Sequence, residues 1–110
     1  MNDPVEKRVL TLLGFAQAAG KVVSGETGVR MALERRKARL VVLAGDAAAA
    51  TKERFVRLAE RMQVPLVELD TDRDALGLAI GKSPRAAIAV MDAQFARAIR
   101  RSLDPEEKQR

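Results

Sequence analysis

The stretch Leu40-Val41-Val42-Leu43-Ala44 is a continuous apolar run of the length of a β-strand, and Gly45-Asp46 ends it. A second run, Ala86-Ala87-Ile88-Ala89-Val90-Met91, has the same character. Strands of a sheet that is covered on both faces are apolar throughout, because neither face meets water. The two runs therefore predict central strands that lie between layers of helices.

Segments with apolar residues at helical spacing lie around these runs, and shorter strand candidates occur at Val22-Val23 and over 65–69. Pro4 suits a first helical position, and Glu6 stands where a capping box would need it. Candidate caps are Asp3, Ser24, Thr51, Thr71 and Asp92, and candidate helix ends are Gly20 and Gly81. The alternation predicts an α/β fold: a three-layer α-β-α sandwich with a small four-stranded mixed sheet. The domain is expected to span residues 1–103, followed by a polar tail over 104–110.

The composition excludes several kinds of chemistry. The chain of 110 residues contains neither cysteine nor histidine, which removes disulfides, thiol nucleophiles, the usual zinc sites and the commonest general base. Carboxylates remain as potential ligands for hard metal ions, so the composition alone does not exclude that chemistry. We nevertheless expect no enzyme activity, no cofactor and no metal. No apolar run reaches the ~18 residues that a membrane span needs, and the first residues do not resemble a signal peptide. The expected location is the cytoplasm, away from membranes.

The charge balance favours a polyanionic partner. Twenty Lys and Arg face 15 Asp and Glu, which gives a formal net charge of +5. Nucleic acid is the first candidate, an acidic membrane surface the second, and a soluble domain that is merely basic stays an alternative. With three Phe and no Tyr or Trp, a stacking platform for single strands is not expected. Structured RNA can be bound through backbone groups and cations alone.

Two segments are candidate binding sites. Ser24-Gly25-Glu26-Thr27-Gly28 opens a predicted helix directly after a short strand. Unpaired N–H groups and the helix dipole at such a point suit an anion or a base edge, although an ordinary capped helix start fits these residues equally well. Lys82-Ser83-Pro84-Arg85 is a basic loop between a helix and a strand. It could clamp a phosphate backbone or simply be solvated.

Other motifs are interpreted as structural. The segment Gly77–Ser83 lacks the glycine spacing of a P-loop and precedes a strand instead of following one. The acids Asp70, Asp72 and Asp74 are interpreted as a helix start. Arginines at 54, 57 and 61 alternate with acids and are expected to form a solvated face. Those at 97, 100 and 101 have no acidic neighbours in their helix and are a secondary candidate contact.

Four stretches, taken in order, resemble a known family: LLGFAQAAGKVVSGETGVRMAL (12–33), LVVLAGDA (40–47), VPLVEL (64–69) and LGLAIGKSPRAAIAVMD (76–92). They are similar to the YlxQ-like bacterial branch of the kink-turn-binding ribosomal protein superfamily, over roughly residues 5 to 100. The small-residue turn over 21–26 and the LGxAIGK stretch are the most specific parts of this resemblance.

The resemblance implies an α-β-α sandwich without catalytic activity that binds kink-turn RNA, a duplex bent sharply at a bulge flanked by sheared G·A pairs. It implies ribosomal or translation-linked RNA as the partner. Two regions would grip the bend. The first matches Ser24, Gly25, Glu26, Thr27, Gly28, Arg30 and Met31, and the second matches Lys82, Ser83, Pro84 and Arg85. Lys21, Lys82 and Arg85 are the expected phosphate contacts.

The chain departs from the family pattern in the first region. Archaeal members carry Asn-Glu where Thr27-Gly28 stands, and a Lys where Met31 stands. Because phosphate contacts position and base contacts specify, RNA affinity is expected to survive with less strict kink-turn selectivity. Glu26 could accept a bond from a base or cap its own helix. A protein-interaction module of the translation machinery, with a decayed RNA surface, remains the alternative, and an enzyme acting on a phosphorylated ligand is a more remote one.

Overall fold

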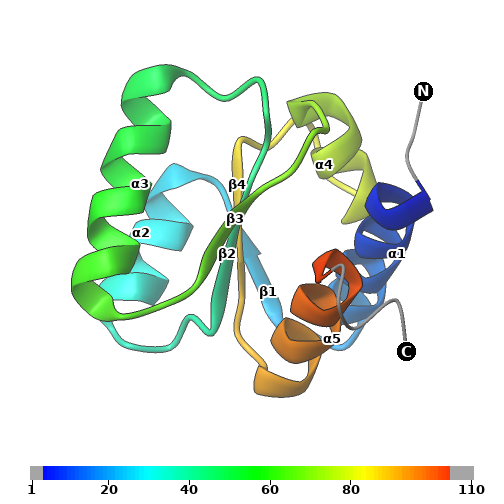
Figure 1. Ribbon diagram of the computed structural model, residues 1–110, viewed down its shortest axis with the longest axis horizontal. Helices are drawn as coiled ribbons and strands as arrows, with labels where there is room; N and C mark the ends of the chain where they lie inside the picture. The colour runs from blue at the N-terminus through cyan, green and yellow to red at the C-terminus, as the bar shows by residue number, and fades with distance from the viewer. Residues whose placement is uncertain (1–3, 105–110) are drawn as a thin grey trace.

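The computed structural model describes residues 4–104, in which helices and strands alternate as predicted (Figure 1). Pro4 is the first helical residue, whereas Asp3 and the tail beyond Asp104 lie outside the described residues. The elements are α1 (Pro4–Ala18), β1 (Val22–Ser24), α2 (Glu26–Glu34), β2 (Leu40–Leu43), α3 (Ala49–Met62), β3 (Leu66–Glu68), α4 (Arg73–Ala79), β4 (Ala87–Val90) and α5 (Ala93–Leu103).

The four strands form one mixed sheet in the order β1-β4-β2-β3. Strand β4 runs antiparallel to both β1 and β2, whereas β2 and β3 are parallel. These directions bring Ser24, Leu43, Glu68 and Ala87 to one end of the sheet, which we call the Ser24 end. The other end, which we call the Val22 end, carries Val22, Leu40, Leu66 and Val90.

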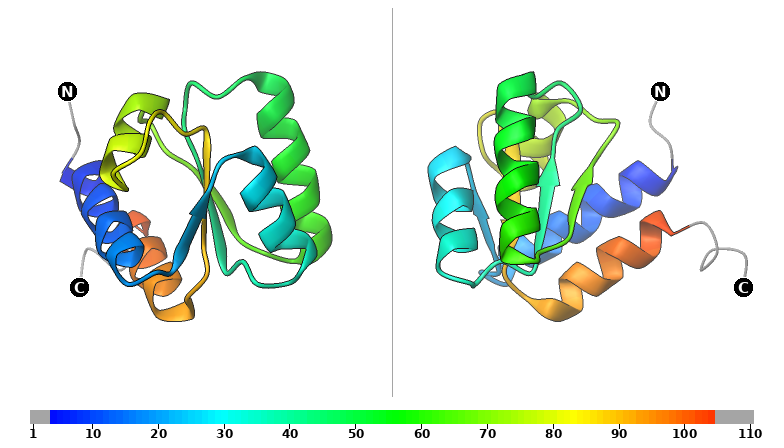
Figure 2. Two further views of the ribbon diagram at one scale, coloured as in Figure 1. Left: turned by 180° about the vertical axis from the view of Figure 1, so that it is seen from behind. Right: turned by 60° about the vertical axis from the view of Figure 1, so that its left-hand side comes forward.

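Helices cover both faces of the sheet, which confirms the predicted three-layer sandwich (Figures 1 and 2). Helices α2 and α3 pack on one face, and α1, α4 and α5 on the other. Successive residues of β2 alternate between the two cores: Val41 and Leu43 belong to the α2/α3 side, and Leu40 and Val42 to the other. All four are fully buried, which explains why this strand is apolar throughout. Within residues 4–104, no helix has both the length and the apolar content to cross a bilayer.

Two predicted hydroxyl caps are wrong, because both side chains have distant partners. Ser24 is the last residue of β1, and its Oγ accepts from Arg85 Nε at 3.0 Å. The residue that caps α2 is Gly25, without any side-chain bond. Thr51 lies inside the first turn of α3, and its buried hydroxyl donates to Glu26 Oε2 at 3.4 Å.

The remaining helix starts give a mixed outcome. Asp92 caps α5 as predicted, with Oδ2 accepting from the amides of Gln94 and Phe95. Helix α4 is capped by Asp72 instead of Thr71, since the Asp72 carboxylate accepts from the Ala75 amide. Glu6 Oε1 accepts from the Asp70 amide at 2.9 Å, 64 residues away. The capping box predicted for Glu6 would involve Asp3, which lies outside the described residues.

Candidate nucleic-acid interface

The sheet brings the two predicted binding regions together at its Ser24 end. Ser24 pairs with Ile88 across the β1–β4 ladder, and the Gly25 amide donates to Ala87 O at 3.0 Å. The start of α2 therefore lies beside the chain that enters β4. Because β1 and β4 are antiparallel neighbours, Ser24 and Arg85, 61 residues apart in sequence, share one surface.

Arg85 connects these two regions through its guanidinium group. Its Nε donates to Ser24 Oγ at 3.0 Å. Its Nη1 lies within hydrogen-bond distance of Ser83 Oγ (2.7 Å), Ser83 O (3.1 Å) and Pro84 O (3.2 Å). A planar guanidinium that bonds to both segments fixes their relative position. The sequence predicts that Arg85 holds phosphate; in the structure its guanidinium joins the two regions.

A surface hollow of about 380 Å³ lies where the two regions meet. Its lining comprises Ser24, Gly25, Glu26, Arg73, Pro84, Arg85 and Ala86. Sequence reasoning missed Arg73, the first residue of α4, whose carbonyl accepts from the Arg85 amide at 3.1 Å. Its side chain is 55% exposed and lies 3.6 Å from Asp46 Oδ2. No local motif identifies Arg73, because a long-range contact brings it to the hollow.

The shape of the basic loop depends on Gly77. A Cβ at position 77 would lie 2.1 Å from Ser83 O and 3.0 Å from Lys82 O, so only glycine fits. The Lys82 amide donates to Gly77 O at 2.8 Å. Lys82 and Ser83 thus pack against α4, whereas Pro84 and Arg85 reach the hollow. Gly77, the first glycine of the LGxAIGK stretch, therefore has a packing role. This agrees with the interpretation that the stretch is not a P-loop.

The start of α2 has an open backbone. Gly25 has φ 87° and ψ 159°, a conformation that other residues rarely adopt. No side chain of the described residues caps this end, so the first amides of the helix face outward as unpaired donors. Thr27 is exposed. A Cβ on Gly28 would approach only Val23 Cβ, at 3.9 Å. This end therefore has the donor geometry that favours an anion or a base edge.

Glu26 does not cap its own helix, which was one of the two roles that the sequence left open for it. Its Oε1 forms an ion pair with Arg54 on α3, and its Oε2 accepts from Thr51. Both partners of the ion pair are about half exposed, so it contributes at most about 1 kcal/mol. Its main effect is to hold the carboxylate beside the first turn of α2. Arg54 therefore belongs to the site and is not simply part of a solvated face.

A second hollow, of about 340 Å³, lies on the α3 side of the same helix start. It is lined by Glu26, Thr27, Arg30, Arg54, Phe55 and Leu58. Arg30 is exposed and Met31 is half-buried, one turn along α2. Glu26 is common to both hollows, so the first turn of α2 is accessible from two sides.

Lys21 lies apart from the other predicted site residues. It precedes β1 at the Val22 end, where its carbonyl accepts from the Met91 amide at 2.7 Å. The three residues of β1 lie between it and Gly25, and the four residue steps span about 13 Å at ~3.3 Å per residue. The structure therefore gathers the two predicted regions but places Lys21 at the opposite end of the sheet.

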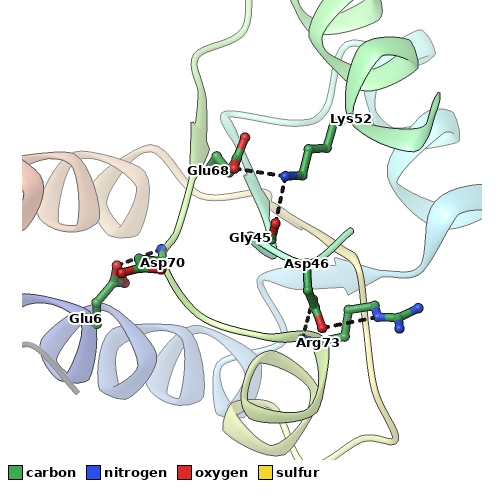
Figure 3. A network of polar contacts seen from close by, with 7 residues as sticks. All are labelled: Glu6, Gly45, Asp46, Lys52, Glu68, Asp70 and Arg73. Carbon is green, nitrogen blue, oxygen red and sulfur yellow. Dashed lines mark hydrogen bonds and ion pairs between the residues drawn. The ribbon is translucent and has the colours of Figure 1, made fainter. Parts of the chain in front are cut away.

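The β2/β3 half of the Ser24 end has the opposite charge (Figure 3). A hollow of about 420 Å³ there is lined by Gly45, Asp46, Glu68, Leu69, Asp70, Thr71 and Asp72. Lys52 bonds to Glu68 Oε2 at 3.0 Å and to Gly45 O at 2.7 Å, which neutralises one carboxylate. Since the other acids outnumber the remaining cation, Arg73, this half repels phosphate.

With this geometry in place, the chain was compared with known proteins. The family described as "Ribosomal protein L7Ae/L30e/S12e/Gadd45 family" matches residues 7–99. The chain belongs to this family. Within the L7Ae family it is similar to the RNA-binding protein YlxQ of Bacillus subtilis, with 38% identity over 93 residues that cover 84% of this chain and 92% of that protein. The resemblance to the YlxQ-like branch is thereby confirmed.

Further members extend the comparison. The large ribosomal subunit protein eL8 of Picrophilus torridus is 32% identical over 82% of this chain and 71% of that protein. Among solved structures, a protein of unknown function from Bacillus halodurans superposes with a TM-score of 0.83, at 35% identity over 87% of this chain and 96% of that one. The Giardia lamblia 15.5kD RNA binding protein superposes with a TM-score of 0.77, at 22% identity over 90% and 87%, and shows the same fold.

Proposed function

We propose that this L7Ae-family protein binds structured, kink-turn-like RNA without catalysing a reaction, and that its target is ribosomal or linked to translation. The observation that carries the proposal is the junction at the Ser24 end. There, the start of α2, which has Gly25 as its N-cap and no side-chain cap, lies beside the basic loop 82–85, and Arg85 connects them through Ser24. The names of two relatives support the proposal: YlxQ is an RNA-binding protein, and the archaeal relative is a protein of the large ribosomal subunit.

The parts of this junction would act on different RNA groups. The outward amides of α2 and its positive dipole end would meet a phosphate or a base edge. Glu26, held by Arg54 and Thr51, would accept from a base amino group, because each of its oxygens keeps further acceptor capacity. Arg30 and Lys82, both exposed, would contact phosphates on either side. Thr27-Gly28 offers fewer groups to a base, so we expect looser selectivity than strict kink-turn recognition.

The direct test is a titration with a short kink-turn RNA and with a control RNA whose G·A pairs are replaced by Watson–Crick pairs, at two salt concentrations. Tighter binding to the kink-turn at both concentrations is the expected result. Equal and salt-sensitive binding to both would contradict kink-turn recognition and leave a general RNA binder. Absence of binding to either RNA by folded protein would contradict RNA binding and favour the protein-interaction alternative.

Two single substitutions test the assigned phosphate contacts. In Arg30→Ala and Lys82→Ala, the slope of log affinity against log salt should become flatter by about 0.7 to 0.9 for each lost contact. Arg57→Ala is the matched control, because Arg57 is also an exposed helix arginine and lines neither hollow. Unchanged slopes in both test variants would contradict the assignment.

A further inference from the structure

Four exposed cations gather at the Val22 end of the sheet: Lys21, Arg36, Lys37 and Arg39. They come from two connections that are distant in sequence. Lys21 O accepts from the Met91 amide, and the Arg39 amide donates to Val90 O. Continuing the strand register by one residue places Lys21 and Arg39 on either side of Met91. Two strand spacings, roughly 10 Å, therefore separate their backbones.

The backbone at Arg36 is unusual for its position. Helix α2 ends with the Arg36 amide donating to Leu33 O and the Lys37 amide to Ala32 O. In this type of helix end, the residue with positive φ is usually glycine, as it is at Gly20 after α1. Arg36 has φ 59° instead. A charged side chain therefore stands where glycine would be less strained. Gln63, after α3, has the same φ.

These cations have few local partners of opposite charge. The ion pairs found within residues 4–104 are Lys52–Glu68, Arg54–Glu26 and Arg73–Asp46, and all lie elsewhere. The acids that adjoin these connections in sequence are Glu34, the last residue of α2, and Asp92, whose carboxylate caps α5, so the four cations outnumber them. The surface therefore keeps a net positive charge that is available to an external anion.

The surroundings favour a nucleic acid over a membrane surface. A membrane-bound surface combines its cations with exposed large apolar side chains. The exposed large hydrophobic residues of the described chain are Phe15, Val56 and Leu78. Val56 and Leu78 lie on α3 and α4, and Phe15, in the last turn of α1, is the one of the three that lies near Lys21. Four cations beside a single apolar side chain match a phosphate backbone, whose contacts position but do not read sequence.

We propose that Lys21, Arg36, Lys37 and Arg39, which we call the Val22-end surface, form a second contact for the phosphate backbone of a bound RNA. This inference rests on the proposed function of the Ser24 end. The first site holds the RNA at the bend, and the Val22-end surface holds a more distant stretch of the same molecule. It would thereby lengthen the protein's footprint and add affinity without adding sequence selectivity.

The test uses three RNAs: a minimal kink-turn hairpin, and two longer forms in which one arm or the other extends beyond the 35 Å length of the protein. The test variant is Arg36→Gln, Lys37→Gln, Arg39→Gln. Its control, Lys7→Gln, Arg8→Gln, Arg57→Gln, makes the same change in charge at exposed helix positions. On one of the long RNAs, the test variant should flatten the salt slope by up to about 0.9 per lost contact. It should bind the hairpin as the wild type does.

A second variant separates RNA contact from a role in stability, because cations at a helix C-terminus also interact with the helix dipole. Arg36→Gly relieves the strained φ, so the melting temperature should hold or rise while affinity for that long RNA falls. Equal affinities and slopes for wild type and test variant on both long RNAs would overturn the inference and leave the first site intact. Equal losses in test and control variants would also overturn it. Wild-type protein that binds none of the three RNAs would instead overturn the proposed function.

Discussion

The two halves of the Ser24 end lie at the same end of the sheet but differ in charge and in the backbone donors that they present. The β1/β4 half presents open amides, Arg30, Lys82 and a loop braced by Arg85. The β2/β3 half presents Asp46, Glu68, Asp70 and Asp72 around a hollow. The contrast shows that the fold alone does not make the Ser24 end a binding surface. The charges and glycines of the β1–α2 and α4–β4 connections make its β1/β4 half the candidate RNA site.

The largest effect is expected from Gly77→Ala, which breaks the packing that shapes the loop on the binding half. The added Cβ would lie 2.1 Å from Ser83 O, and backbone must move to accept it. Overpacking of this kind costs about 1–3 kcal/mol of unfolding free energy. Urea unfolding should show this loss, and RNA affinity should fall with it.

The matched control for that substitution is Gly28→Ala. A Cβ there would meet only Val23 Cβ, at 3.9 Å. Alanine favours helix over glycine by up to about 1 kcal/mol, so stability should hold or rise. Destabilisation by Gly28→Ala equal to that of Gly77→Ala would contradict the packing account.

A smaller effect is expected from Arg85→Ala, which separates the two segments of the binding half. Its bonds to Ser24 and to the loop would be lost, at a cost of about 1–2 kcal/mol for a half-buried group. A double-mutant cycle with Ser24→Ala should give a coupling energy of roughly 0.5–1 kcal/mol. Additive effects of the two substitutions would show that the brace is unimportant in solution.

Still smaller effects on stability are expected from Glu26→Ala and Arg54→Ala, because their ion pair is half exposed. Both should change stability by less than about 1 kcal/mol but reduce discrimination between kink-turn and Watson–Crick control RNA several-fold. Glu53→Ala, an exposed position on α3, serves as the control. Unaltered discrimination in both variants would show that Glu26 does not contact a base.

The smallest effect is expected from Asp70→Asn on the acidic half. Removing one exposed carboxylate should raise RNA affinity by no more than about threefold at low salt, and the gain should vanish near physiological salt, where the Debye length is about 8 Å. Binding titrations at two salt concentrations would measure it. A loss of affinity would indicate that the acidic half contacts the RNA.

The layers of the fold could be predicted from sequence because they depend on local pattern. The runs beginning at Leu40 and Ala86 are apolar on both faces, and the structure buries β2 and β4 from both sides. The cap at Asp92 was predicted correctly for the same reason, since its acceptor bonds lie within its own helix.

The errors concern side chains whose partners are far away in sequence. Ser24 and Thr51 have the composition of caps, but Arg85 and Glu26 engage their hydroxyls. Lys21 is only three residues from Ser24, but strand β1 runs between the two ends of the sheet and places Lys21 at the Val22 end. Arg73 reaches the site because its carbonyl meets the Arg85 amide. No local pattern contains these pairings, so they required the structure.

The most direct test of the central claim is an amide-resolved NMR titration of the protein with a short kink-turn RNA. The account predicts that the largest shifts occur at the amides of Glu26, Thr27 and Gly28 and of Lys82, Ser83 and Arg85, while those of Glu68, Asp70 and Asp72 change little. Shifts concentrated on the acidic half, or spread evenly over the surface, would contradict an RNA site on the β1/β4 half of the Ser24 end.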